Sequence, residues 1–100
     1  MDRAQNIREM EKIFDKHNEL IKKLSEFLDE FESDLGAYEK LKQYYGSKTW
    51  QEDKDDYDKG KYENIKAGVL SEDAIYNLIA DNYFLALKLL NLANKVLQDH

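Results

Sequence analysis

Apolar residues recur at alternating spacings of three and four along the first half of the chain, which is the pattern of one face of an α-helix. The series is Ile7, Met10, Phe14, His17, Ile21, Leu24, Leu28, Phe31, Leu35 and Tyr38, with His17 as its interruption. These residues occupy the a and d positions of a heptad repeat. Ile13, Leu20, Phe27 and Leu41 fall on a neighbouring position. The stripe is therefore broad, and it suits packing against more than one element better than the narrow seam of a two-stranded coiled coil.

The ends of this first helix are marked by capping residues. Asp2, with Gln5 three positions later, can cap its start, and Gly46 can supply the left-handed residue that ends it. We expect a helix over about residues 3–45, roughly 60 Å long at about 1.5 Å per residue. The Ser33 to Gly36 stretch is where a break would come, but the stripe keeps its phase beyond it, which favours one continuous helix.

Two further helices follow. Ser47 is the expected N-cap of a short helix over about 48–59, closed by Gly60, and residues 61–70 have no sustained period and predict a loop. Ser71 is the expected N-cap of a long helix over about 72–97, with acids in its first turn and Leu70 packing on Ile75. This last helix is apolar on more than one side, so it should be the most buried element or should meet a partner.

Together these patterns predict an all-α protein of one domain over residues 1–100. The simplest arrangement is an elongated three-helix bundle in which the last helix lies antiparallel to the first. Composition agrees, since the 100 residues include no proline, four glycines and 36% charged residues, which suits long uninterrupted helices.

The charge balance narrows the classes of partner. Fifteen basic and 21 acidic residues give a net charge of −6, which opposes phosphate backbones and anionic lipid head groups. Nucleic acid and membrane are not expected as direct partners. The chain opens with Met, Asp and Arg, unlike a signal peptide, so a cytoplasmic location is expected. The absence of cysteine removes disulfides, thiolate nucleophiles and sulfur-ligated zinc.

His17 is the one internal histidine and lies at a d position, where an imidazole would be partly buried. It is either a general base or metal ligand, or a core histidine bonded to a neighbour, and the second interpretation is favoured. Di-iron bundles need Glu-x-x-His on two helices, but Phe14 stands three residues before His17.

The acidic run Glu52, Asp53, Asp55, Asp56 and Asp58 suggests a calcium loop. With Gly60 at loop position 6, however, positions 3, 5 and 12 would be Tyr57, Lys59 and Lys66, none of which is a suitable ligand. The run is interpreted as a solvated helix face, with a docking surface for a basic partner as the weaker alternative.

Aromatic residues cluster where the first two helices meet. They are Trp50 and the tyrosines Tyr44, Tyr45, Tyr57 and Tyr62. Exposed together they would form an interaction surface of the kind that anchors protein interfaces. An aromatic plug that seals one end of the bundle is the favoured alternative, and a mixture with Trp50 inside and tyrosines outside stays open.

Asn82, with Asp81 beside it, falls on the apolar face of the last helix. A buried asparagine that fixes helix register is the favoured interpretation. The alternative is a polar core or pocket made by His17, Asp81, Asn82 and Tyr83. No glycine-rich phosphate loop, serine elbow or nucleophile with its base is present, so no enzyme, cofactor or metal is expected.

Two short stretches carry a family resemblance: Tyr44-Tyr45-Gly46-Ser47 followed by Trp50 and Asp53, and Gly68-Val69-Leu70-Ser71-Glu72-Asp73. In these the chain resembles the bacterial family known as domain of unknown function 4298, whose members are small helical proteins found mainly in Gram-positive bacteria. The resemblance covers most of the chain and implies a helical cytoplasmic protein. The resemblance implies no activity, no ligand and no catalytic residue.

The expected function is a non-enzymatic protein-protein interaction module, which binds another protein or forms a homodimer through the apolar surplus of its long helices. Two alternatives stay open. One is an acidic inhibitor or antitoxin-like protein that covers a basic target, and the other is a small-ligand or metal-binding bundle that uses His17.

Overall fold

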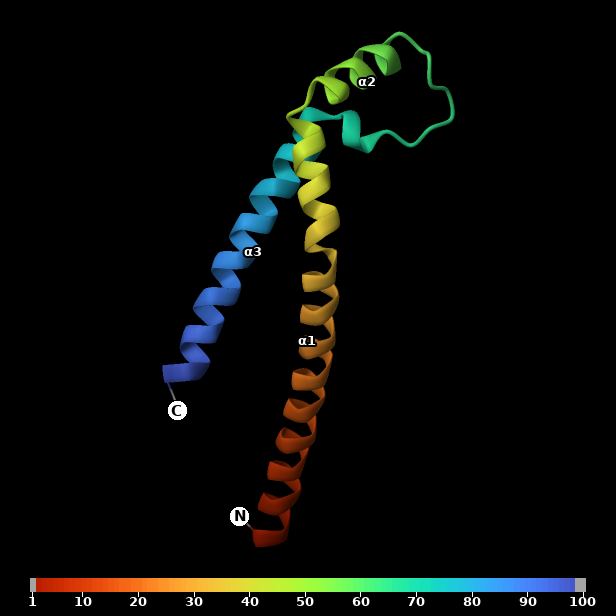
Figure 1. The fold of residues 1–100 in the computed structure, drawn as a ribbon. Coiled ribbons are helices and arrows are strands. Elements are labelled where there is room, and N and C mark those ends of the chain that lie inside the picture. Colours follow the sequence, from red (N-terminus) through yellow and green to blue (C-terminus); the bar gives the residue numbers. More distant parts are fainter. Residues whose placement is uncertain (1, 99–100) are drawn as a thin grey trace. The chain divides into compact units, whose positions relative to one another are not determined.

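The structure, a computed structural model, describes residues 2–98. It contains helix α1 (Arg3–Tyr45), helix α2 (Lys48–Asp58), the 3₁₀ turn η1 (Gly68–Leu70) and helix α3 (Glu72–Gln98), in that order along the chain (Figure 1). No strand occurs among the described residues. The all-α prediction of a long, a short and a long helix is confirmed, with each boundary within one residue of its expected place.

The chain divides into two compact units, residues 1–38 and 39–100. The N-terminal unit (1–38) is most of α1. The C-terminal unit (39–100) holds the last turns of α1 together with α2, η1 and α3. The single domain expected over 1–100 stays a prediction.

Helix α1 runs without a break through Ser33 and Gly36, as the unbroken phase of the stripe indicated. The Ser33 hydroxyl donates to the Asp29 carbonyl at 2.9 Å, so it is satisfied on the helix itself. At the start of the helix, the Asp2 side chain accepts from the Ala4 N–H at 3.2 Å, which confirms the cap.

The prediction that Gly46 ends α1 in a left-handed conformation is wrong. Among the described glycines only Gly60 has a positive φ. The chain instead leaves α1 through a tight turn in which the Ser47 N–H donates to the Tyr44 carbonyl at 3.0 Å. The Ser47 hydroxyl donates to the same carbonyl at 2.7 Å. Two donors thus satisfy a carbonyl of the last turn, and a left-handed residue is not needed.

The caps of α2 follow the sequence closely. The Ser47 hydroxyl accepts from the Trp50 N–H at 3.1 Å. At the other end Gly60 has φ +82°, its N–H donates to the Tyr57 carbonyl at 2.9 Å, and the Lys61 N–H donates to the Asp56 carbonyl at 3.1 Å. These two bonds form a Schellman motif, in which glycine takes the left-handed position without a steric penalty.

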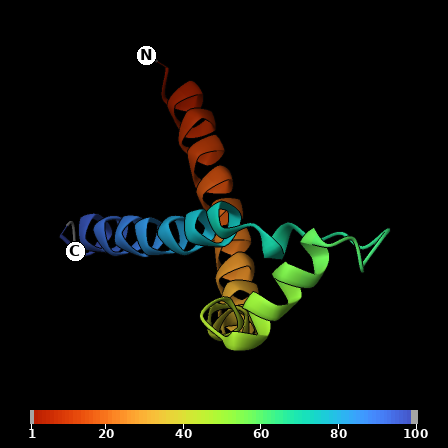
Figure 2. The ribbon, with the colours of Figure 1, turned by 90° about the horizontal axis from the view of Figure 1, so that it is seen from above.

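The segment 59–67 leaves α2 and returns through η1 to α3 (Figure 2). Asn64 in this loop has φ 67°, a left-handed residue that no sequence pattern indicated. The Ser71 hydroxyl accepts from the Ala74 N–H at 3.3 Å, and Glu72 and Asp73 lie in the first turn of α3, so the predicted start of α3 is confirmed.

The buried core of the described residues is small. Trp50 and Ile75 are 4% and 3% exposed, and both belong to the C-terminal unit. No residue of α1 is buried. None of the described helices has the length and apolar character needed to cross a membrane.

The two glycines Gly60 and Gly36 should respond in opposite ways to alanine. Gly60→Ala forces a Cβ into a left-handed position and should destabilise the protein by about 1 kcal/mol. Gly36 lies inside α1 with nothing within 4 Å of an added Cβ, so Gly36→Ala should stabilise the helix by roughly 0.5–1 kcal/mol. Urea unfolding followed by helical circular dichroism measures both, and equal effects would contradict the assignment of Gly60 as the C-terminal cap.

Candidate functional site

The aromatic cluster lies in the C-terminal unit, where the last turn of α1 meets the start of α2 and η1. We call the set Tyr44, Tyr45, Trp50, Asp53 and Val69 the aromatic junction. Its geometry decides which of the predicted aromatic residues are core and which are open to a partner.

Trp50 is the central residue of the junction. Its indole N–H donates to the Val69 carbonyl at 2.8 Å, which joins α2 to η1. The Tyr45 ring meets the indole edge-on, with centroids 5.3 Å apart and an interplanar angle of 80°, a favourable aromatic geometry. Because Trp50 is 4% exposed, it is a core residue. Trp50 is therefore not part of an exposed interaction surface, and a plug that seals one end of the bundle stays a prediction.

Tyr44 and Asp53 form the polar contact of the junction. The Tyr44 hydroxyl donates to Asp53 Oδ2 at 2.6 Å across the turn between the helices, a short bond to an ionised acceptor. This bond raises the pKa of Tyr44 to about 12, with smaller contributions from burial and from repulsion by the Asp53 charge. The phenol is therefore held in its neutral form.

A cavity of about 270 Å³ opens beside this contact. Its lining residues are Tyr44, Asp53, Tyr57, Tyr62, Ile65, Lys66, Ala67, Val69 and Leu70. Tyr57 and Tyr62 are each 38% exposed, so these two are the tyrosines that face outward. The lining offers aliphatic and phenolic surface together with the side chains of Asp53 and Lys66. A cavity of this volume has room for one side chain of another molecule.

The acidic run of α2 is engaged inside the chain. Three carboxylates pair with lysines: Glu52 with Lys48 at 3.9 Å, Asp58 with Lys54 at 3.3 Å, and Asp56 with Lys61 at 3.2 Å. Asp55 accepts from the Gln51 side chain at 3.1 Å, and Asp53 accepts from Tyr44. Within the described residues no group of three or more histidine, cysteine, aspartate or glutamate side chains could hold a metal ion.

The residues of the predicted polar core lie in different units. His17 is exposed in the N-terminal unit, so the partial burial expected of it is not seen there. Asp81 is exposed and Asn82 half-buried on α3 in the C-terminal unit. A polar core or pocket of His17, Asp81 and Asn82 stays a prediction.

Sequence reasoning missed the partners in the junction. It placed Trp50 near the tyrosines but found neither the Val69 carbonyl nor the Asp53 carboxylate as an acceptor. A backbone acceptor has no side-chain signature, so the Val69 contact carried no signal. The Tyr44–Asp53 contact carried one, because both residues belong to the same family motif nine positions apart.

Loss of the indole N–H should weaken the junction. Trp50→Phe keeps an aromatic ring but leaves the Val69 carbonyl without its donor, so we expect a loss of about 1–3 kcal/mol in the free energy of unfolding. Tyr57→Phe, at an exposed ring on the same helix, is the matched control and should change it by less than about 0.5 kcal/mol. Equal losses in urea unfolding would show that the indole bond is not the specific contact.

Raising the pH should remove the contribution of the Tyr44–Asp53 hydrogen bond to the free energy of unfolding. Because the fold holds the Tyr44 pKa above its ordinary value of 10.0, at about 12, this contribution is complete below pH 10 and declines as the pH rises toward 12. The wild-type protein should lose stability relative to Tyr44→Phe over that window. Asp53→Asn should return the Tyr44 pKa toward 10, measured by tyrosinate absorption. A pH titration curve unchanged by either substitution would contradict the contact.

Comparison with known proteins finds one family match. A family model described as "Domain of unknown function (DUF4298)" matches residues 7–92, which include both motifs and most of the three helices. No curated protein and no solved structure matches the chain. Since the match spans well over half of the residues, this chain belongs to the family described as domain of unknown function (DUF4298).

Proposed function

We propose that this chain is a non-enzymatic protein-protein interaction module whose binding surface is the apolar face of α1 in the N-terminal unit. The observation that carries the proposal is a continuous exposed stripe. Its members are Ile7, Met10, Ile13, Phe14, Leu20, Ile21, Leu24, Phe27, Leu28, Phe31 and Leu35. All eleven fall on three adjacent heptad positions, and they are 38–67% exposed. We call this set the α1 stripe.

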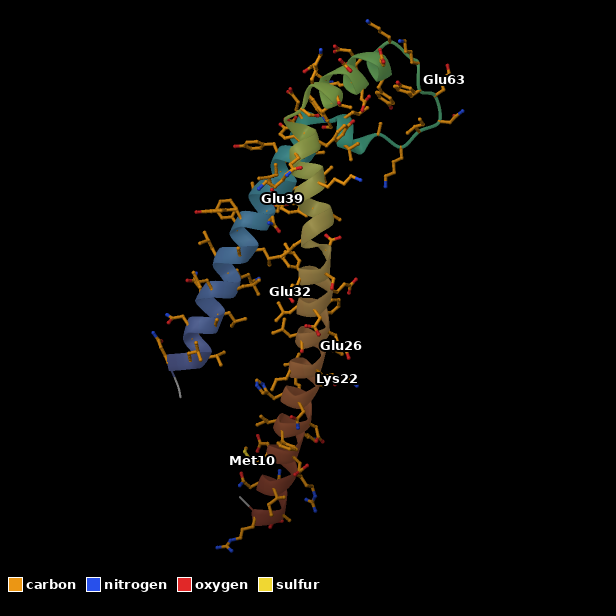
Figure 3. All side chains as sticks on the ribbon, viewed as in Figure 1. Met10, Lys22, Glu26, Glu32, Glu39 and Glu63 are labelled. Carbon is orange, nitrogen blue, oxygen red and sulfur yellow. The ribbon has the colours of Figure 1, made fainter. Side chains whose placement is uncertain are left out.

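Such a surface is costly for a helix that stays alone in water. Monomeric proteins rarely expose contiguous apolar patches of this extent, and larger ones mark interaction sites. Helices also gain most of their stability from packing an apolar face rather than from propensity. Figure 3 shows Met10 on one side of α1 and Lys22 and Glu26 on the other.

The chain's own third helix is shorter than the helix that carries the stripe. Helix α3 has 27 residues and α1 has 43, a difference of 16 residues, or roughly 24 Å at about 1.5 Å per residue. Helix α3 itself exposes large apolar residues along most of its length, and of its described residues only Ile75 is buried. A partner supplies the missing contact.

The alternatives receive less support. An acidic inhibitor or antitoxin-like protein would use free carboxylates, whereas all five acids of α2 have partners inside the chain. A small-ligand or metal-binding bundle would use His17, which is exposed on its helix. The cytoplasmic location expected from the sequence stays a prediction.

A substitution in the middle of the α1 stripe should abolish binding. We expect Leu24→Glu/Leu28→Glu to lose the partner, or the self-associated form, with affinity reduced tenfold or more, because two charges enter a buried apolar contact. Lys12→Gln/Glu26→Gln changes the opposite face at constant net charge and is the matched control. Light scattering and pulldown from native cells measure both, and a strict monomer with no retained protein would overturn the proposal.

A further inference from the structure

The charges of the N-terminal unit are unevenly distributed along α1. Residues 3–23 hold six basic and four acidic side chains, a net charge of +2. The six basic residues are Arg3, Arg8, Lys12, Lys16, Lys22 and Lys23. Residues 24–38 hold five acids and no base, a net charge of −5. These acids are Glu26, Asp29, Glu30, Glu32 and Asp34. The helix is thus basic in its first half and acidic in its second, while the α1 stripe continues through both.

We propose that the α1 stripe binds the same stripe of a second copy of this chain, with the two helices antiparallel. The inference rests on the proposed function and names the partner for that surface. In an antiparallel pair a positions face d positions of the other helix. One register aligns every layer of the repeat: Ile21 faces Leu24 of the second copy, and Phe14 faces Phe31 of the second copy.

Charge selects this direction over the parallel one. In a parallel pair in register, the −5 half of one helix would lie along the −5 half of the other, and like charges held side by side are unfavourable. In the antiparallel pair the half with charge +2 of each helix lies along the half with charge −5 of the other helix. Opposite charges therefore attract one another at both ends of the dimer. Orientation is therefore set by the distribution of charge, while the stripe supplies the apolar contact.

The available surface matches what a stable dimer needs. Burial of one large apolar side chain removes roughly 60–120 Å² of apolar surface. Eleven such side chains, each about half exposed, can therefore contribute roughly 330–660 Å² of apolar surface per copy, which is about the apolar part of one partner's share (about 800 Å²) of a standard specific interface.

Two contacts in this register work against the pairing, and the first places His17 against Leu28 of the second copy. Glu11 and Glu32 both occupy e positions, and in the antiparallel pair Glu11 approaches Glu32 of the second copy. The contact is at the solvent-exposed rim, where a like-charge pair costs little. It supplies a sharp test, because Glu11→Lys converts this contact into an opposite-charge pair only in the antiparallel arrangement.

The first experiment uses sedimentation and light scattering of the full chain, which should have twice the 11.8 kDa mass of one copy. Arg8→Glu/Lys16→Glu/Lys22→Glu makes the first half acidic, and Asp29→Lys/Glu30→Lys/Glu32→Lys makes the second half basic. Each triple variant alone should dimerise roughly tenfold or more weakly than wild type, and an equimolar mixture of the two should form a heterodimer. Glu11→Lys should tighten the wild-type dimer several-fold.

The second experiment measures direction. The chain has no cysteine, so Lys12→Cys or Glu19→Cys places one spin label per copy on the side of α1 away from the stripe. In the antiparallel dimer the two labels at residue 12 are about 32 Å apart along the axis and those at residue 19 about 10 Å. A parallel dimer gives the same separation at both sites.

The outcomes separate this inference from the proposed function. A monomer that still retains a different protein through the α1 stripe would overturn the second copy as occupant and leave the interaction module standing. A parallel dimer, or a dimer that both triple variants form normally, would overturn the charge-directed pairing. A monomer that binds nothing would overturn both.

Discussion

The indole N–H of Trp50 bonded to the Val69 carbonyl is the contact on which the C-terminal unit depends. It joins residues 19 positions apart and fixes η1 against the first turn of α2. This contact closes the chain between α2 and η1 and offsets part of the closure entropy of the loop. Tyr45 packs on the indole and directs its hydroxyl to the Glu72 carbonyl at 3.5 Å, which brings the start of α3 to the same place. Three helix ends are thus organised around one side chain.

A junction of this kind fixes the ends of helices but does not stabilise their full lengths. Among the described residues, Trp50 and Ile75 are the buried apolar ones, a small core for about a hundred residues, whose ordering costs on the order of 100 kcal/mol in conformational entropy. The proposed association would supply the remaining stabilisation by covering the long apolar faces. Folding of α1 would then be linked to association, and the stability of the proposed module would depend on its concentration or on that of its partner.

The helices and most of their ends could be predicted because their signals are local. Asp2, Ser47, Gly60 and Ser71 each act within four residues of their own position, where hydroxyl, carboxylate and glycine chemistry is readable from sequence. The prediction for Gly46 was wrong because the neighbouring Ser47 satisfies a carbonyl of the last turn of α1, that of Tyr44, and starts the next helix at once. The left-handed Asn64 and the Val69 acceptor were not predictable, because backbone conformation in an irregular loop is set by contacts distant in sequence.

The two motifs of the family likewise act locally, at the places where helices of the C-terminal unit begin and end. Tyr44, Ser47, Trp50 and Asp53 account for the turn, the cap, the core and the polar contact of the junction, while the stretch from Gly68 to Asp73 supplies its acceptor and the start of α3. All of these residues have a structural role in the C-terminal unit. The motifs therefore explain how the helices are joined, and the proposed binding surface lies elsewhere. The α1 stripe lies outside both motifs, and a surface defined by periodicity and charge can change its residues while keeping its pattern. Recognition by such a surface depends on the broad apolar face for affinity and on the order of charges along the helix for direction.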